Sequence, residues 1–145
     1  MSRHEYDIEI QQAGSWTLQL AAVGSKECLQ IANAGGAAAV AGAMINFVED
    51  VTIQRRGCGT LCALANGADA DEVRKHICNM IVTAGGPSAV ILALSQHKDD
   101  ATLQALGLAT LSGLAYVDAT SRGILIQLDA CFTIVAAMRG HPANA

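Results

Sequence analysis

The side chains in this sequence that could do chemistry are its cysteines and histidines. Cys58 and Cys62 lie four residues apart, so they would share one face of a helix, and His76 stands two residues before Cys78. Zinc sites use such ligands, but they need four that converge, typically in closely spaced pairs. The sequence contains no CxxC, and its nearest pairs would have to converge from separate parts of the chain. The spacing therefore predicts no metal site.

Catalytic chemistry finds equally little support in the sequence. A cysteine nucleophile needs a histidine base and a third group that orients it around a pocket, and the spacing suggests no such arrangement. The chain has no phosphate loop, GxSxG or HExxH motif. Its carboxylates gather where helices are expected to begin, and helix capping explains them there. We expect a protein that is not an enzyme and that binds no cofactor.

The composition indicates one domain with exposed apolar surface. The chain has 145 residues, of which 52% are hydrophobic and only 15% charged, against a usual charged fraction of about 25%. Such a surface is normally covered by a partner or by another copy. The net charge of −4 and the absence of a basic run argue against nucleic-acid binding.

The cellular compartment is predicted from three features: the N-terminal sequence, the length of the apolar runs and the positions of the cysteines. The first residues, MSRHEYDIEIQQ, lack the apolar region of a signal peptide. No apolar run reaches the ~18–20 residues of a membrane span. The five cysteines lie in apolar periodic segments, so we expect buried, reduced thiols. We expect an intracellular protein, cytoplasmic by default, with the nucleus left open.

A short motif recurs three times along the chain. It reads IQQAGSWTLQLAA at residues 10–22, IQRRGCGTLCALA at 53–65 and LQALGLATLSGLA at 103–115. The shared pattern is [IL]-Q-x-x-G-x-x-T-L, repeated after 43 and then 50 residues. Self-similarity at such a period is typical of stacked-repeat proteins.

Apolar spacings of three and four residues predict that the elements around this motif are helices. A helix capped by Ser25 ends at Ala34, where Gly35 and Gly36 allow a sharp reversal. The next helices are expected at about 37–47, and then from Glu49 and Asp50 to Asn66 and Gly67.

The same three helices return about 50 residues later. Asp69 and Glu72 form a plausible capping box for a helix that reaches Ala84. Gly85 and Gly86 repeat the reversal, Pro87 stands in the first turn of a helix to Gln96, and Asp99 and Asp100 open a helix to Tyr116. A final partial unit contains a helix from Thr120 or Ser121 and another over Leu128–Met138.

Two long stretches carry a family resemblance. IANAGGAAAVAGAMINFVEDVTIQRRGCGTLCALA (31–65) and IVTAGGPSAVILALSQHKDDATLQALGLATLSGLA (81–115) resemble armadillo repeats. The resemblance extends over about residues 8–139. It implies an all-α armadillo-type α-solenoid, a right-handed superhelix whose third helices line a concave groove. It also implies two full repeats, about 25–67 and 68–117, between two partial ones, about 1–24 and 118–145.

The resemblance further implies an adaptor that holds proteins or peptides in that groove. Peptide binders of the family place a Trp and, four residues later, an Asn on the third helix. The matching positions here are Trp16 with Leu20, Gly59 with Ala63, and Ala109 with Gly113. The tryptophan is therefore present once and the asparagine at none of these positions. Nuclear-import-type recognition of a basic peptide is therefore not expected. The predicted groove positions are Gln12, Trp16, Arg55, Gly59, Ala105 and Ala109.

Several alternatives stay open at these positions. Trp16 could contact a partner or be covered by residues 1–6, and of the adjacent Arg55 and Arg56 one could face the groove. We expect the recurring Gly14, Gly57 and Gly107 to face the neighbouring repeat, where a missing side chain lets helix axes approach closely. Gly59 and Gly113 are expected on the groove face, which would then be smooth, shallow and mostly apolar.

Two functions follow from these expectations. The first is a protein-interaction adaptor or scaffold that binds along the groove. The second is a self-assembling structural module whose half-repeat ends join head to tail into dimers or higher oligomers, since the two ends are complementary.

Overall fold

The structure, a computed structural model, describes the backbone of residues 3–142 and the side chains of residues 7–142. Over the described backbone the regular elements are nine α-helices, and no strand occurs there, as the all-α prediction requires. The helices are α1 (Arg3–Ala21), α2 (Ser25–Asn33), α3 (Gly36–Asn46), α4 (Val51–Asn66), α5 (Asp71–Thr83), α6 (Gly86–Gln96), α7 (Ala101–Val117), α8 (Ala119–Gln127) and α9 (Ala130–Gly140).

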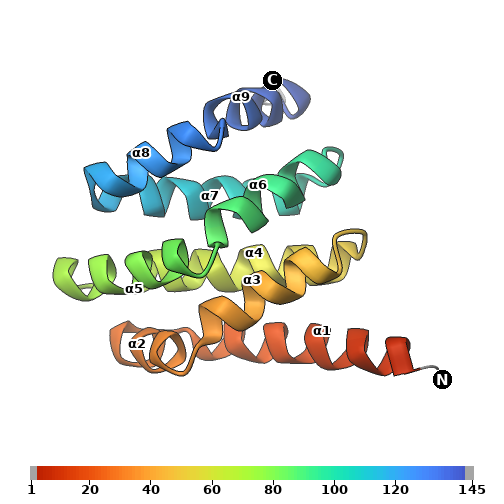
Figure 1. The fold of residues 1–145 in the computed structure, drawn as a ribbon, viewed down its shortest axis with the longest axis horizontal. Coiled ribbons are helices and arrows are strands. Elements are labelled where there is room, and N and C mark those ends of the chain that lie inside the picture. The colour runs from red at the N-terminus through yellow and green to blue at the C-terminus, as the bar shows by residue number, and fades with distance from the viewer. Residues whose placement is uncertain (1–2, 143–145) are drawn as a thin grey trace.

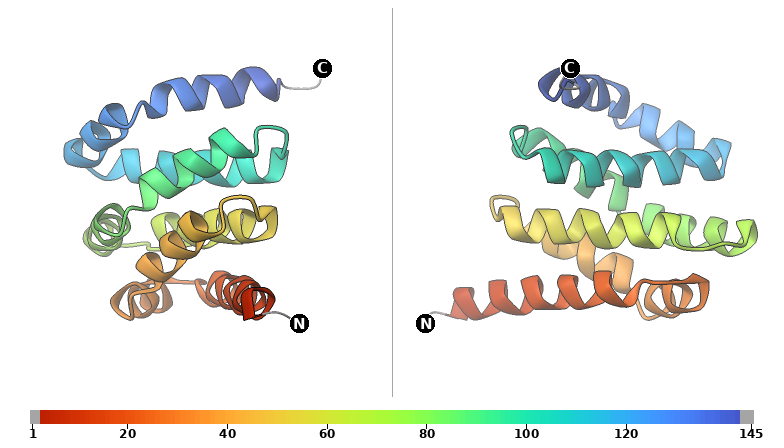
Figure 2. Two further views of the ribbon diagram at one scale, coloured as in Figure 1. Left: turned by 45° about the vertical axis from the view of Figure 1, so that its right-hand side comes forward. Right: turned by 180° about the vertical axis from the view of Figure 1, so that it is seen from behind.

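The helices stack one layer on another, an arrangement compatible with an α-solenoid (Figure 1). Helices α1 and α2 lie at one end of the stack and α8 and α9 at the other (Figures 1 and 2). Helix α4 packs against α1 and α7 more extensively than any other helices pack together. We call α1, α4 and α7 the third-helix row, and α3, α6 and α9 the middle helices.

Three sharp bends set the shape of each layer. Helix α3 turns from α2 by 66°, α6 from α5 by 66°, and α9 from α8 by 76°. The first two bends use the predicted glycines, because Gly35 (φ 83°) and Gly85 (φ 80°) take the left-handed conformation. The third uses Asp129 at φ 56°, so α9 begins at Ala130 and not at Leu128.

No single described helix is long and apolar enough to cross a membrane. Each of the three bent helix pairs passes the same test of length and composition when the pair is taken as one segment.

Aspartates cap three of the helices. Asp50 accepts a 2.8 Å hydrogen bond from the backbone N–H of Ile53, and Asp100 accepts one of 2.9 Å from Leu103, as the sequence predicts. At α8 the cap is Asp118, which accepts from the N–H of Ser121 at 2.7 Å. The prediction that Thr120 or Ser121 starts that helix is therefore wrong, because a carboxylate just upstream takes this role.

Two predicted caps are not formed. Helix α2 follows Gly24, and its first residue, Ser25, instead accepts a 2.8 Å hydrogen bond from the N–H of Asp69 in the next layer. Helix α5 follows Ala70, which has no side chain that could cap, so the capping box of Asp69 with Glu72 is wrong. At both places the chain enters the helix at a different residue from the one that the sequence pattern indicates.

The motif places the same apolar residues in the core of both complete layers. Ile53, Leu61 and Leu64 of α4 are fully buried. The matching residues of α7 are buried as well: Leu103, Leu111 and Leu114. All of these except Ile53 pack in one hydrophobic cluster with residues of the middle helices.

The glutamine of the motif ties each third helix to its middle helix. Gln54 Nε2 donates to the carbonyls of Met44 (2.8 Å) and Phe47 (2.9 Å), which lie at the end of α3. Gln104 Nε2 repeats this with Leu94 and His97 at the end of α6. The carbonyls in the last turn of a helix have no partner within it, so each buried amide satisfies one of them. It shares the cap carbonyl with a backbone N–H of the following loop.

The glycine of the motif lies against the middle helix of its own layer. A Cβ atom at Gly57 would stand 2.5 Å from Met44, and one at Gly107 would stand 2.7 Å from Leu94. The expected close approach therefore exists, but its direction differs, because the facing helix belongs to the same layer and not to the neighbouring repeat. Gly14 differs again, since nothing lies within 4 Å of its Cβ position.

The threonine of the motif ties one layer to the next. Thr60 Oγ1 contacts the carbonyl of Ser15 on α1 at 2.9 Å, and Thr110 Oγ1 contacts that of Cys58 on α4 at 3.2 Å. Both hydroxyls also lie within hydrogen-bond distance of a carbonyl one turn earlier in their own helix. The third-helix row is thus held in a single register.

We predict opposite effects for alanine at different glycines. Gly57→Ala and Gly107→Ala force a methyl group into Met44 or Leu94, and we expect each to lower the free energy of unfolding by about 1–3 kcal/mol. Gly42→Ala in α3 is the control, because nothing lies within 4 Å of its Cβ position, and it should gain about 0.5–1 kcal/mol. Urea unfolding followed by circular dichroism measures all three. Equal stability of the Gly57 and Gly42 variants would contradict the packing described here.

Candidate functional site

The third-helix row offers the surface on which the sequence places a binding groove. Trp16, Arg55, Ala105 and Ala109 are exposed there and Gln12 is half-buried. These five lie on α1, α4 and α7, of which α4 packs against both of the others. The row therefore brings most of the predicted residues to adjacent helices.

Gly59 is the exception among the predicted site residues. It is buried, and a Cβ atom there would collide with the side chain of Gln19 on α1. Gly113 is also buried, and its Cβ position lies 2.7 Å from Asn66 of α4. The prediction that both line an open groove is wrong, because each glycine makes room for a side chain of the preceding third helix.

Gln12 and Arg55 already have partners within the row. Gln12 Nε2 donates to both carboxylate oxygens of Asp50, at 3.2 and 3.1 Å. Arg55 occupies the matching place one layer on, where its Nε donates to Asp100 Oδ2 at 2.7 Å and an Nη lies 2.5 Å from the same oxygen. Both side chains thus reach the aspartate that caps the next third helix. Their first role is to align the row.

The Arg55–Asp100 pair lies at the edge of solvent. The arginine side chain is 49% exposed and the aspartate 11%. The hydrogen bond from Arg55, followed by that from the Leu103 N–H, holds the pKa of Asp100 below its usual value against the opposing effect of burial. Asp100 is therefore a carboxylate whose charged form stabilises the fold.

Trp16 is an exposed aromatic side chain of the row. Its side chain is 45% exposed, and the Arg56 guanidinium lies 5.4 Å from the ring centroid. Arg56 Nη1 also donates to the carbonyl of Gln12 at 2.8 Å, and this hydrogen bond holds the guanidinium in place beside the ring. The alternative that residues 1–6 cover Trp16 concerns side chains outside the described residues.

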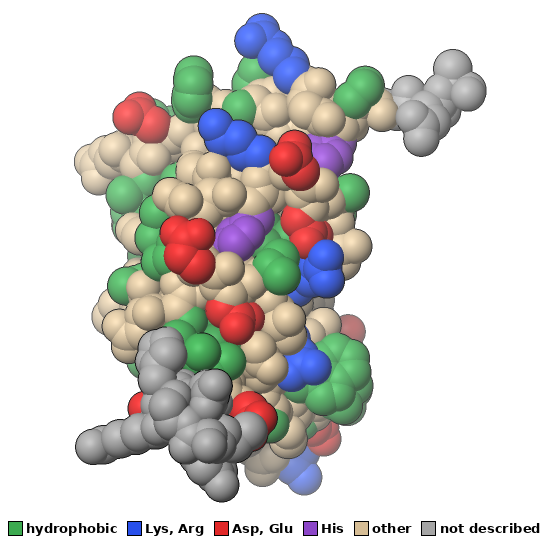
Figure 3. Space-filling view, turned by 90° about the vertical axis from the view of Figure 1, so that its right-hand side faces the viewer, with side chains coloured by type: hydrophobic (Ala, Val, Ile, Leu, Met, Phe, Trp, Pro, Cys, Tyr) green, Lys and Arg blue, Asp and Glu red, His purple; other side chains and the backbone are tan. Residues whose placement is uncertain are grey.

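A shallow hollow of about 310 Å³ runs beside this tryptophan. All three third helices line it, and no acidic side chain is among its described lining residues, although the chain has more acidic than basic residues. On the face that Figure 3 shows, by contrast, acidic, basic and histidine side chains are mixed without forming a patch of one sign. The lining residues of the hollow are Trp16, Gln19, Thr52, Arg55, Arg56, Thr102 and Leu106.

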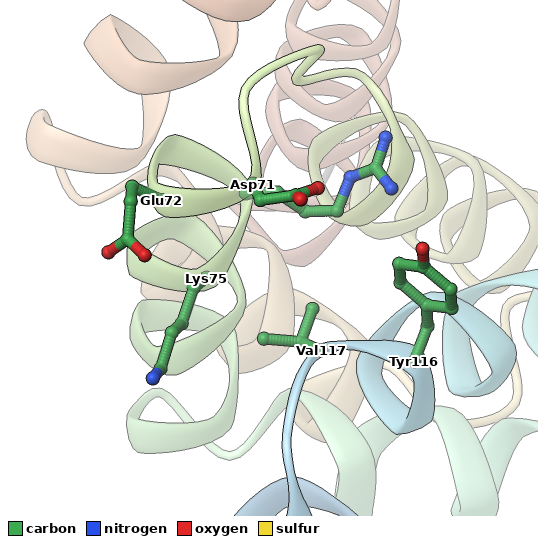
Figure 4. A pocket seen from close by; sticks show the side chains of 6 residues that line it. Asp71, Glu72, Lys75, Tyr116 and Val117 are labelled. Atoms are coloured by element: carbon green, nitrogen blue, oxygen red, sulfur yellow. The ribbon is translucent and has the colours of Figure 1, made fainter.

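A second hollow, of about 320 Å³, lies between the start of α5 and the end of α7 (Figure 4). Tyr116 projects toward it and is 72% exposed, with the Arg74 guanidinium 5.8 Å from its ring. Arg74 is held by hydrogen bonds of 3.1 and 2.8 Å to the Ala68 carbonyl. The sequence analysis did not single out this place. The signal was available in Tyr116, a rare aromatic residue near the end of the motif helix.

The residues considered for chemistry lie apart. Among the described residues no group of three His, Cys, Asp or Glu is placed to hold a metal ion. All five cysteines are free; three are buried, Cys62 is half-buried, and Cys131 is exposed. The expectation of buried cysteines is thus wrong at Cys131, which is exposed near the start of α9.

Burial makes the inner thiols weaker acids. It raises the pKa of Cys58 to about 12 and that of Cys78 to about 11, and it also raises the pKa of Cys28 and of Cys62. Since the thiolate is the nucleophile, these groups are poor candidates for a catalytic role.

No protein-family model matches the chain, and no curated protein or solved structure matches it significantly.

We predict that thiol labelling separates the cysteines by burial. In dilute solution Cys131 should react first and Cys62 more slowly, while Cys28, Cys58 and Cys78 react only after unfolding. Labelling with iodoacetamide, with sites assigned by mass spectrometry, measures the order. Labelling of Cys58 as fast as that of Cys131 would contradict the packing of α4.

We predict that Asp100 contributes to acid unfolding. Because its folded pKa is lowered, its stabilisation is present above the usual value of 3.8 and is lost as the pH falls through the folded value. Asp100→Asn keeps a capping side chain but removes this titration, so its thermal midpoint should fall less than that of the wild type between pH 7 and pH 3. In an Arg55→Gln background the same substitution should have a smaller effect. An identical pH profile for Asp100→Asn and wild type would refute the assignment.

Proposed function

We propose that this protein is an armadillo-type interaction adaptor of the reducing cell interior, with full repeats at 25–67 and 68–117 and partial repeats at 1–24 and 118–145. The support is that the two proposed full repeats share their glycine turn, their aspartate cap, and their buried glutamine and threonine at matching positions. A protein built of such layers presents a continuous surface along its row of third helices.

The binding surface in this proposal is the hollow beside Trp16. The single observation that carries it is a tryptophan that is 45% exposed, stacked with Arg56, at the wall of a hollow lined by three helices. Tryptophan and arginine are the residues that most often dominate binding energy at protein interfaces. The ring is also preorganised, because Arg56 is itself anchored to the backbone of α1.

The chemistry of the hollow indicates what kind of segment would fit. Its walls carry two arginines, threonine hydroxyls and the apolar Trp16 and Leu106. The neighbouring Ala105 and Ala109 are exposed and short, so a partner's backbone can approach α7 closely. We therefore propose a partner segment in which an acidic side chain meets Arg56 and an apolar side chain meets Trp16 and Leu106.

The experiment is a selection from a displayed peptide library on the wild-type protein. We expect enriched peptides to combine acidic and apolar residues. Trp16→Ala should weaken their binding about thirtyfold, the equivalent of ~2 kcal/mol for an interface hot spot. Ala109→Asp should also weaken binding, because it adds a negative charge where an acidic segment approaches.

The matched control is Leu92→Ala, which removes an apolar side chain, 37% exposed, from α6 and away from the hollow. It should bind the selected peptides as the wild type does. Peptides that bind Trp16→Ala and wild type equally, or a selection without any enrichment, would refute the proposed surface. Thermal unfolding of each variant excludes loss of fold as the cause.

A further inference from the structure

The two ends of the stack expose faces that match the inside of the same molecule. Within the described residues, α9 is a middle helix without a third helix packed on it, and α1 is a third helix without a middle helix of its own layer. These ends lie at opposite extremes of the stack, so α1 cannot reach α9 of the same chain (Figure 1). Each end is also rich in exposed apolar side chains: Ile10, Leu20, Ile126, Phe132, Val135 and Met138.

The motif glycine gives the first match between the two faces. Inside the molecule it packs against a large residue three positions before the cap residue of the middle helix, as Gly57 does with Met44 and Gly107 with Leu94. At the ends, Gly14 has open space beside it, and Met138 stands three positions before the matching cap residue. Met138 is 63% exposed, whereas Met44 and Leu94 are 1% exposed.

The apolar residue four positions before this glycine gives the second match. Its counterparts Ile53 on α4 and Leu103 on α7 are fully buried. The matching residue of α1, Ile10, is 62% exposed. A middle helix packed on Gly14 would cover this side chain too, because both positions belong to the buried stripe of the motif helix.

The polar tethers give the third match. Gln11 is the counterpart of Gln54 and Gln104, whose acceptors are the carbonyls of the third residue before the cap and of the cap itself. On α9 these are the carbonyls of Met138 and His141. Thr17 is the counterpart of Thr60 and Thr110, and the matching acceptor on α7 is the carbonyl of Leu108.

Side-chain sizes along the row give the fourth match. Inside the molecule, Gly59 makes room for Gln19. At the ends the sizes are reversed, since Trp16 takes the place of Gly59 and the shorter Ser112 takes the place of Gln19. Tyr116 and Leu20, the counterparts of Asn66 and Gly113, are 72% and 58% exposed. Both are larger than their counterparts, so this pair does not reproduce the glycine contact inside the molecule.

A hollow marks the place where a further third helix would lie. It measures about 320 Å³ and lies between α6, α7 and α9. Its walls include Gln104 and Leu94 from the last complete layer and Phe132, Ala136 and Ala137 from α9. In the complete layers α4 and α7 each pack against both a middle helix and the preceding third helix, and this hollow presents the same pair of walls.

We infer that the occupant of this face is α1 of a second copy of the chain, which joins head to tail and completes the layer begun by α8 and α9. The inference goes beyond the proposed function, because the joined faces are the ends of the stack. One hydrogen bond of the row is absent at this junction. Gln12 and Arg55 each donate to an aspartate cap, but their counterpart on α7 is Ala105, which has no donor in its side chain. A heterologous contact of this kind builds rings if it closes and filaments if it does not.

The first experiment is sedimentation of the wild-type protein over a dilution series. We expect the average mass to rise above the 14.9 kDa of one chain as the concentration increases. Alkylation of Cys131 gives an independent readout. Its counterparts Ala37 and Pro87 are buried inside the molecule, so its labelling rate should fall with increasing concentration. A chain that stays monomeric at every concentration overturns the inference and leaves the face to a different protein.

The second experiment uses Gly14→Leu. In the monomer this leucine meets nothing, so the thermal midpoint in dilute solution should stay or rise, because glycine is a poor helix former. At the junction it collides with Met138, and we expect at least a tenfold weaker association. The matched control is Asn79→Leu, which adds the same side chain to an exposed position. This position is on α5, a helix that belongs to neither end of the stack (Figure 1). It should associate as the wild type does.

A rescue tests the pairing itself. Met138→Ala alone should weaken association by removing an apolar contact, whereas Gly14→Leu combined with Met138→Ala should associate more tightly than Gly14→Leu alone, because the added side chain fills the space that is vacated. Association of Gly14→Leu at wild-type strength would overturn the junction. Loss of association without rescue would overturn the pairing of Gly14 with Met138.

Discussion

The structure depends on the close approach of each third helix to the end of its middle helix, held by one buried glutamine amide. Gln54 and Gln104 each give both of their N–H donors to carbonyls at the end of a middle helix, one in its last turn and one at its cap. A buried amide that missed these acceptors would cost on the order of 1–3 kcal/mol, so only one register of the two helices satisfies it. This register brings the helices so close that the facing position, Gly57 or Gly107, has no room for a side chain. The glycine and the glutamine of the motif are therefore two consequences of one contact.

A second set of polar contacts passes the register from layer to layer. The threonine hydroxyls reach the preceding third helix, while Gln12 and Arg55 reach the aspartate that caps the following one. His97 and His141 add hydrogen bonds of 2.7 and 2.6 Å to carbonyls in the preceding loops, those of Val48 and Lys98. Each contact links only adjacent layers, so the stability of such a stack is nearly a sum of layers and of their junctions. The end layers lack one junction each, which explains why apolar side chains that are buried in the middle of the stack are exposed there.

The sequence predicts the elements well and their contacts poorly. Helix period, the paired glycines at 35–36 and 85–86, and the caps Asp50 and Asp100 are local signals, and the structure confirms them. A period of 3.6 residues assigns Gly59 to the same face as Arg55 and so predicts that it lines an open groove. Which face a neighbour covers depends on the angle and distance between helices, and no local pattern contains that information. For the same reason the sequence does not predict which helix Gly57 faces, or that Cys131 is exposed. It also does not predict that Ser25 bonds to Asp69 and does not cap a helix.

The exposed hollow and the exposed end share α1, and Trp16 lies where the two meet. Successive residues of a helix are rotated by about 100°, so Gly14 and Trp16, two positions apart, point in widely different directions. The counterparts of Trp16 show what its position experiences inside the stack: Gly59 is buried, and Ala109 is exposed. The position thus lies at the edge of the contact between third helices, with its outer side open to solvent. A second copy joined through Gly14 would therefore leave the outer face of the Trp16 ring accessible. It would also carry α7 of one copy up to α1 of the next, so the third-helix row would continue across the junction and repeat its hollow once in every copy. An assembly would then offer several identical hollows at once. A partner with several matching segments would bind the assembly more tightly than it binds one copy, as in multivalent attachment, although each individual site is unchanged.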